Sequence, residues 1–235
     1  MLRTENATIT LGGGAASSVA IEEAINTDLA SAAPLRRLDL FAWSGTDGGG
    51  TITAPSIGRA IVGRDFSGDI ITGPVDSLVV GLVMQNANVR VAGPLGRLRL
   101  ASANNVRMNV AGDIRSVSIG YLTQSQIYAG VRPLPEGSPV PSDLADFVAP
   151  FSIGRLRVSQ ADASGGSVIA AHAVRTAYLK LVDLTDAPRI VVAADTISRV
   201  TARAYILAGK SLRTVRVPVL EDEAHSLGSV ELRAL

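Results

Sequence analysis

The chain of 235 residues has no cysteine, few aromatic residues and almost no net charge. Without cysteine, it can form neither a disulfide framework nor a thiolate metal site. Only 4% of its residues are aromatic whereas 47% are hydrophobic, so aliphatic side chains must fill the interior. A formal net charge of +1 excludes a strong overall field towards nucleic acid or anionic membranes.

Long apolar runs and the common cofactor motifs are also missing. No stretch approaches the roughly 18 uninterrupted apolar residues of a membrane span, so we expect no membrane insertion. The polar start is not followed by an apolar run, so we expect no secretory signal within the sequence. The glycine runs at 12–14 and 48–50 lack the lysine of a phosphate-binding loop. His172 and His225 stand far apart without ligand spacing, so we expect no metal and no cofactor.

The sequence does contain a repeat of about twenty residues. Each unit begins with an apolar residue, here called the anchor, and apolar residues follow three and five positions later. The residue two positions after the anchor is polar in every unit, and this alternation predicts a half-buried strand. The anchors are Leu35, Ile57, Val75, Leu95, Ile114, Ile153, Val174, Ile197, Leu212 and Leu227.

Most units end in a second alternating segment that closes on a small residue, as in 106–112 and 205–209. Such a unit cannot bury its apolar face alone, whereas parallel stacking of many units can. We therefore predict an all-β fold, a single right-handed parallel β-helix (β-solenoid) of about ten coils over residues 35–235. The alternative is a leucine-rich repeat, which Leu95-x-x-Leu98-x-Leu100 resembles. It is disfavoured because Ala103 stands where Asn or Cys is expected and because the rest of the unit alternates with period two.

The two ends of the chain depart from this repeat. Residues 1–34 are predicted to form an N-terminal strand and cap, in which the apolar spacing after Ser17 and Ser18 indicates a short capping helix. The competing interpretation is another degenerate coil, because residues 18–21 also alternate. Beyond Ile197 the units shorten to 15 residues, which suggests either an irregular closing hairpin or a piece of a longer protein.

Residues 131–151 interrupt the repeat between the anchors Ile114 and Ile153. Four prolines fall within nine residues of this segment, which prevents a regular strand ladder. Ser142 is suited to cap one or two helical turns. We expect an inserted Pro-rich loop that protrudes from one corner of the solenoid.

Residues 43–58 and 113–131, the latter with its proline-rich sequel, carry a resemblance. They resemble the β-solenoid repeat regions of large surface or secreted proteins of environmental bacteria, notably planctomycete-like ones. The resemblance implies an extracellular or cell-surface location and a long repeat protein of which this chain is one module. Such proteins have no agreed catalytic residues, so none is transferred to this chain.

Four arginines form the candidate ligand-binding site. Arg97, Arg99, Arg155 and Arg157 stand two and four positions after their anchors, on coils two apart, so their Cα atoms should lie about 10 Å apart across one face. Regularly spaced guanidinium groups suit the carboxylates or sulfates of an acidic polysaccharide. The alternative is a solvated face that discourages edge pairing. Nucleic acid is disfavoured, because few aromatic residues accompany the arginines.

Acidic residues offer a weaker, enzymatic hypothesis. Asp162 and Asp183 each stand nine positions after an anchor, Asp186 is nearby, and Asp65 and Asp69 flank another turn. Polysaccharide lyases and glycoside hydrolases on parallel β-helices need such carboxylates, but solvated turns explain them equally.

No convergent polar site is evident from the sequence. It therefore favours a non-enzymatic structural or adhesive module of a bacterial surface or secreted protein, with acidic polysaccharide or other surface proteins as partners. The enzymatic alternative is a polysaccharide lyase or a glycoside hydrolase.

Overall fold

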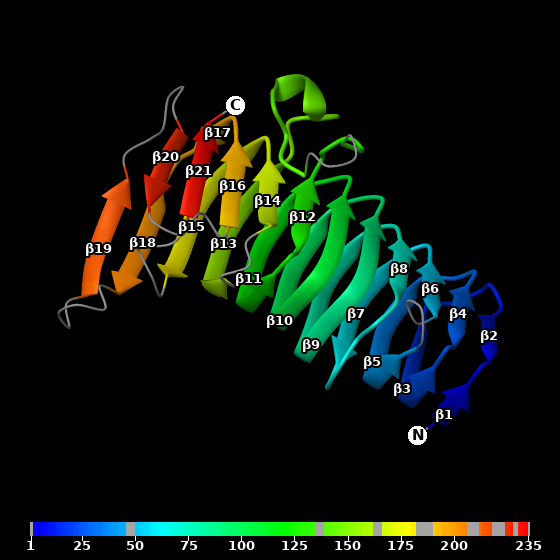
Figure 1. The fold of residues 1–235 in the computed structure, drawn as a ribbon. Helices are drawn as coiled ribbons and strands as arrows, with labels where there is room; N and C mark the ends of the chain where they lie inside the picture. Colours follow the sequence, from blue (N-terminus) through cyan, green and yellow to red (C-terminus); the bar gives the residue numbers. More distant parts are fainter. Residues whose placement is uncertain are drawn as a thin grey trace.

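The computed structural model describes residues 2–45, 50–134, 139–161, 166–181, 190–205, 212–217, 224–227 and 230–234. Side chains are described as far as residue 201, with the exception of Leu181. Within these residues the chain winds into an all-β, parallel β-solenoid of about nine turns (Figure 1). The predicted fold class is therefore confirmed, whereas the right hand of the solenoid stays a prediction.

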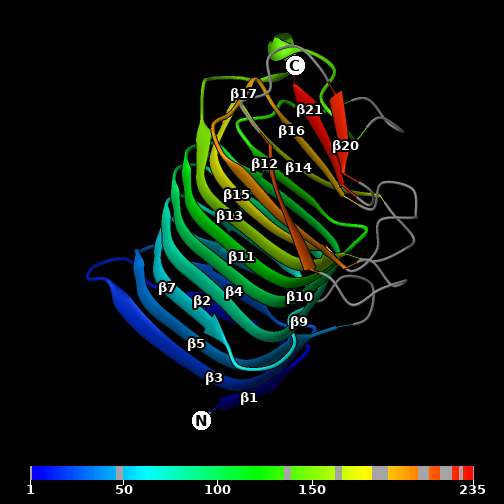
Figure 2. The ribbon, with the colours of Figure 1, turned by 90° about the vertical axis from the view of Figure 1, so that its left-hand side faces the viewer.

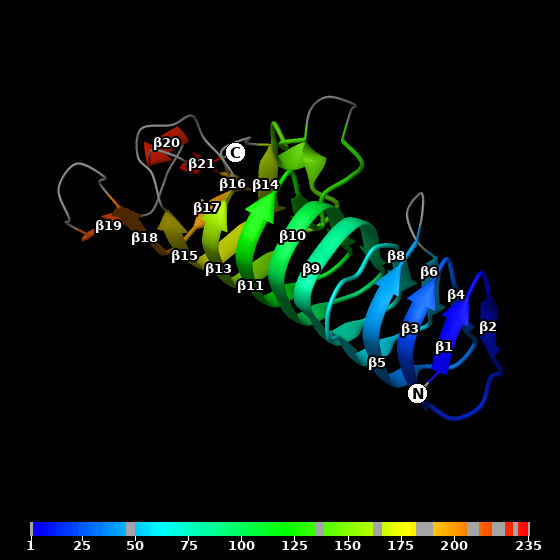
Figure 3. The same ribbon diagram turned by 60° about the horizontal axis from the view of Figure 1, so that its bottom comes forward.

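The turns follow one another in sequence order along the solenoid, with the N-terminus at one end (Figures 1 and 3). Their first strands pair in parallel and form a long column, whose curved members lie one over another in Figure 2. This column contains β1 (Leu2–Glu5), β3 (Ser17–Ile25), β5 (Leu35–Ser44), β7 (Ile57–Val62), β9 (Val75–Val91), β10 (Leu95–Val110), β11 (Ile114–Thr123), β13 (Ser152–Ala161), β15 (Ala173–Leu181), β17 (Thr196–Ile197) and β18 (Val200–Tyr205).

The second strands of the turns form another parallel column on the other side of the corner. The long strands β9 and β10 run through this corner, so their second halves belong to it. The column also contains β2 (Thr8–Leu11), β4 (Asp28–Ser31), β6 (Thr51–Ala54), β8 (Asp69–Thr72), β12 (Gln126–Ala129), β14 (Ser167–Ala171), β16 (Ile190–Ala194) and β21 (Val230–Ala234).

Apolar side chains from like positions of successive turns stack inside the solenoid. Leu98 on β10 pairs with Val117 on β11, which in turn pairs with Leu156 on β13. All three are at most 1% exposed. Because neighbouring strands are about 4.8 Å apart, each turn covers the apolar layer of the one before it. In the turns whose anchors run from Leu35 to Val174, the predicted inward positions, three and five after the anchor, are buried and form the core.

The corner between the columns has a feature that the repeat did not reveal. Five residues there have positive φ, namely Asn6 (48°), Asn26 (46°), Asn86 (46°), Asn105 (51°) and Gln124 (44°). Asparagine adopts this left-handed region more readily than most residues. The side chains also form a ladder, since Asn105 Nδ2 donates to Asn86 Oδ1 at 2.8 Å and Asn26 Nδ2 to Asn6 Oδ1 at 3.2 Å.

The predicted N-terminal capping helix is wrong. Ser17–Ile25 forms strand β3, which pairs in parallel with both β1 and β5. Its apolar residues satisfy a strand as well as a helix, because Ile21 and Ala24 turn inward and are buried. Stacking on β5 also gives the backbone hydrogen-bonding groups partners in the neighbouring turn, which outweighs a short helical pattern.

The last two predicted anchors do not begin parallel turns. Leu212 lies in β19 (Leu212–Val217), which pairs antiparallel with β18, and Leu227 lies in β20 (Ala224–Leu227), which pairs antiparallel with β21. Intervals of 15 residues are too short here for a complete turn of two strands and two corners, so the strands fold back on their neighbours. The solenoid consequently has about nine turns instead of ten.

The insertion follows β12 and protrudes from the corner at the end of that strand (Figure 1). It contains a short 3₁₀ helix, η2 (Leu144–Asp146), which Asp143 caps by accepting from the Ala145 N–H, so the predicted cap at Ser142 is wrong by one residue. Ser142 instead donates its N–H to Asp146 Oδ2 at 2.6 Å, which lowers the pKa of that carboxyl. The Tyr128 hydroxyl donates to the Pro139 carbonyl and ties the loop to β12. No helix in the described part of the chain is long and apolar enough to span a membrane.

Candidate functional site

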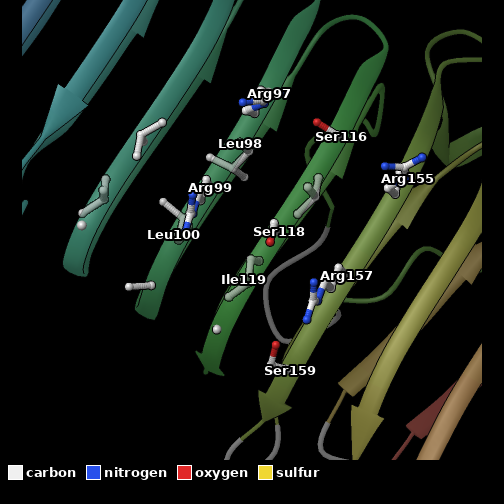
Figure 4. Close-up of a pocket in the computed structure, with 16 residues that line it drawn as sticks. Arg97, Leu98, Arg99, Leu100, Ser116, Ser118, Ile119, Arg155, Arg157 and Ser159 are labelled. Carbon is white, nitrogen blue, oxygen red and sulfur yellow. The ribbon is translucent and has the colours of Figure 1, made fainter.

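The four predicted arginines lie together on the outer surface of the long column. In the register, Arg97 on β10 pairs with Ser116 on β11, which pairs with Arg155 on β13. One step further along the strands, Arg99 and Arg157 flank Ser118 in the same way. Figure 4 shows these arginines on two strands with the serines on the strand between them.

Backbone alternation explains why the four side chains share one face. Leu98 separates Arg97 from Arg99 and is fully buried, as is Leu156 between Arg155 and Arg157. Since neighbouring residues of a strand point to opposite sides, both arginines of each pair must point outward, and all four are exposed. The small serines on β11 leave the space between the two arginine-bearing strands open.

Two overlapping hollows lie on this surface. One, of about 690 Å³, is lined by all four predicted arginines. The other, of about 830 Å³, includes three of them and adds arginines from β7, β11 and β15. We call this surface the arginine face and define it by Arg59, Arg97, Arg99, Arg115, Arg155, Arg157 and Arg175.

Three members of the arginine face were missed because they do not follow the selected pattern. Arg59 stands two positions after its anchor, but Ile61 occupies position four, so β7 lacks the double signal of β10 and β13. Arg115 and Arg175 stand at position one, next to the buried anchor. Both are nevertheless exposed, because positions one and two both face outward. Reading the two positions together would have found these residues.

The arginine face has little compensating negative charge. Asp76 is the one carboxylate among the residues that line the two hollows. In the part of the chain that the structure describes, no ion pair involves an arginine of this face, although Arg37 binds Asp39 at 2.6 Å at the neighbouring end of the column. The Arg157 guanidinium lies 5.6 Å from the centroid of the Tyr178 ring. The remaining guanidinium groups are directed at solvent and can receive anionic groups bidentately.

The chain matches no family model, no curated protein and no solved structure at a significant level. The β-solenoid assignment therefore rests on the strand pairing. A function has to be inferred from the arrangement of side chains on the surface.

The acidic candidates do not form a comparable site within the described residues. Asp69 Oδ1 accepts from the N–H of Asn88 at 3.2 Å and from its Nδ2 at 3.1 Å, which gives it a structural role between β8 and β9. The backbone carbonyl of Asp65 accepts a hydrogen bond from the backbone N–H of Trp43 at 3.0 Å. Asp162, Asp183 and Asp186 lie outside the described residues.

The histidines show no ligand arrangement either. His172 Nδ1 is 3.8 Å from Asp195 Oδ2, and its ring meets the Phe147 ring edge-on at 6.1 Å. The backbone of His225 belongs to β20, and its side chain is outside the description. Across the described ranges, no three His, Asp or Glu side chains are placed to hold a metal ion.

Proposed function

We propose that the chain is a non-enzymatic β-solenoid module of a bacterial surface or secreted protein, and that its arginine face binds acidic polysaccharide. One observation carries the proposal: seven arginines line two joined hollows whose lining includes a single carboxylate. A rigid parallel sheet holds the arginines at fixed spacing, as recognition of a regular polymer requires.

Weak contacts become effective here through their number. One exposed ion pair contributes only about 0.2 to 1 kcal/mol, because water and salt screen it. An extended polyanion that crosses several turns forms many such pairs at once, and each pair raises the effective concentration of the next. Because the arginines have no competing carboxylates beside them other than Asp76, little has to be displaced when the polymer binds.

The location and the class of protein are supported by the resemblance of residues 43–58 and 113–131 to solenoid repeats of bacterial surface and secreted proteins. A stiff solenoid also suits a spacer or adhesive segment, because each turn contacts only its neighbours and the module can be extended by further turns. Other surface proteins with acidic patches are the second class of partner that this surface could bind.

The experiment compares two quadruple variants in a binding assay with polygalacturonate at low salt. Replacement of Arg97, Arg99, Arg155 and Arg157 by serine should abolish measurable binding. The control removes the same charge from outside both hollows by replacing Arg64, Arg90, Arg107 and Arg132, and it should bind like the parent protein. Equal losses of polygalacturonate binding in the two variants would mean that net charge alone causes binding, and would contradict a specific site.

The same mixture tests the enzymatic alternative. A lyase would release unsaturated ends that absorb in the ultraviolet, and a hydrolase would release new reducing ends. We expect neither from the purified protein. Turnover that persists after repurification would overturn the non-enzymatic part of the proposal.

A further inference from the structure

Positions one and two after the anchor form two adjacent columns on the arginine face, and their residues alternate from turn to turn. Where position one is glycine, position two is arginine. Where position one is charged on the strands from β7 to β15, position two is serine or threonine, whereas β5 has Arg36-Arg37. From β7 to β15 the successive pairs are Gly58-Arg59, Asp76-Ser77, Gly96-Arg97, Arg115-Ser116, Gly154-Arg155 and Arg175-Thr176.

The alternation has a steric cause. A Cβ on Gly96 would lie 2.3 Å from the carbonyl oxygen of Asp76, and a Cβ on Gly154 would lie 2.7 Å from that of Arg115. Such approaches are shorter than real side chains tolerate, so glycine is required on the turns that follow Asp76 and Arg115.

As a result, these two columns present one arginine on each of five successive turns, in a zigzag. Arg97 on β10, Arg155 on β13 and Arg199 between β17 and β18 occupy the position-two column, whereas Arg115 on β11 and Arg175 on β15 occupy the position-one column. The first four along the chain line the larger hollow, and Arg199 is exposed on the next turn. Consecutive members lie one strand apart and one residue aside, a Cα separation of about 6 Å, and members of one column lie about 10 Å apart.

We propose that the arginine face binds a linear polyuronate laid along the solenoid axis, with one uronate sugar per turn. The strand spacing is close to the length of one hexose in an extended chain. When successive sugars of such a chain are turned over, their carboxylates point alternately to its two sides. The zigzag places a guanidinium on the matching side at each turn, and this inference rests on the proposed function.

Asp76 defines one end of the zigzag. It occupies the position-one column on β9, where the alternation would otherwise place the next arginine. Its carboxylate repels a polyanion at that turn and separates Arg59 on β7 and Arg36 on β5 from the five-turn run. The uninterrupted site therefore covers about five sugars, one for each turn, at the strand spacing of about 4.8 Å.

The test is a length series of oligomannuronates, from disaccharide to octasaccharide, titrated at low salt. Affinity should rise with each sugar up to about five and then level off, and each arginine replaced should lower it about two- to fivefold. In Asp76→Arg the rise should continue up to the octasaccharide, because the run then extends over Arg59 on β7 to Arg36 on β5. An affinity that keeps rising with oligosaccharide length in the parent protein would contradict binding of one sugar per turn. A plateau at the same length in Asp76→Arg would contradict it as well.

A double variant separates this inference from the proposed function. The parent protein should bind polymannuronate, which carries a carboxylate on every sugar, better than hyaluronan, which carries one on every second sugar. Arg115→Ser with Arg175→Ser removes the two arginines of the run that stand at position one and should abolish this preference. Arg90→Ser with Arg107→Ser is the matched control and should keep the preference. If the first double variant binds like the parent, polyanion binding stands and the zigzag is wrong. If no polyanion binds the parent, both proposals fail.

Discussion

Gly96 lies directly against the carbonyl oxygen of Asp76, which a Cβ at residue 96 would approach to 2.3 Å. Gly96→Ala should therefore destabilise the solenoid by about 1 to 3 kcal/mol, because backbone must shift to admit the methyl group. Gly12→Ala is the matched control, since a Cβ there meets nothing within 4 Å. Thermal unfolding of both variants measures the difference, and equal melting temperatures would contradict the close approach.

Val117 provides a test of the inward and outward assignment. Val117→Asp places a carboxylate between the apolar layers of Leu98 and Leu156 and should cost several kcal/mol of unfolding free energy. Ser116→Asp on the same strand faces outward and should change the free energy by no more than about 0.5 kcal/mol. Denaturant unfolding of the two variants checks this, and similar losses would mean that the register is wrong by one residue.

The corner ladder predicts a contrast between two substitutions at Asn105, whose φ is 51°. Asn105→Ala loses the hydrogen bond to Asn86 and forces a less tolerant residue into the left-handed region, at a cost of about 1 to 2 kcal/mol. Asn105→Gly loses the same hydrogen bond but adopts positive φ freely. The glycine variant should be the more stable of the two in thermal unfolding, and the opposite order would contradict strain at this corner.

Tyr128 makes stability depend on pH in the alkaline range. Burial raises its pKa from 10.0 to about 12, although Arg107 opposes the shift. The folded state therefore retains a proton that the unfolded state loses above pH 10. This contribution to stability is fully present below pH 10 and is lost as the pH rises to about 12.

Ultraviolet titration and denaturant unfolding check the Tyr128 prediction. One phenol should ionise near pH 12, and Tyr128→Phe should remove part of the loss of stability between pH 10 and pH 12. An unchanged pH profile in Tyr128→Phe would show that burial does not raise the pKa of the Tyr128 hydroxyl.

The fold was predictable because one alternation recurs in every turn. Stacking requires Leu98, Val117 and Leu156 to be apolar and their neighbours to be polar, so the requirement is written directly into the sequence. The ends were mispredicted for the opposite reason. At β3 a helical spacing and an alternating one coincide, and at Leu212 an apolar residue serves an antiparallel strand as well as a parallel turn.

The site was predictable only in part. Arg97 and Arg155 follow from simple alternation, because position two faces outward in any such strand. Arg115 and Arg175 depend on the fact that position one also faces outward, which arises where Gly96 and Gly154 fit against neighbouring carbonyl groups. That close approach is a property of the stacked backbone, and a single unit read by itself does not show it.

The most direct test of the arginine face is the salt dependence of its affinity for polygalacturonate. In the parent protein, affinity should fall steadily as salt rises, because exposed charges are screened within about 8 Å at 0.15 M. With Arg97, Arg99, Arg155 and Arg157 replaced by serine, binding should fall below the measurable range even at low salt. No binding by the parent protein at low salt would contradict polyanion binding by the arginine face. An affinity with unchanged salt dependence in the quadruple variant would contradict it as well.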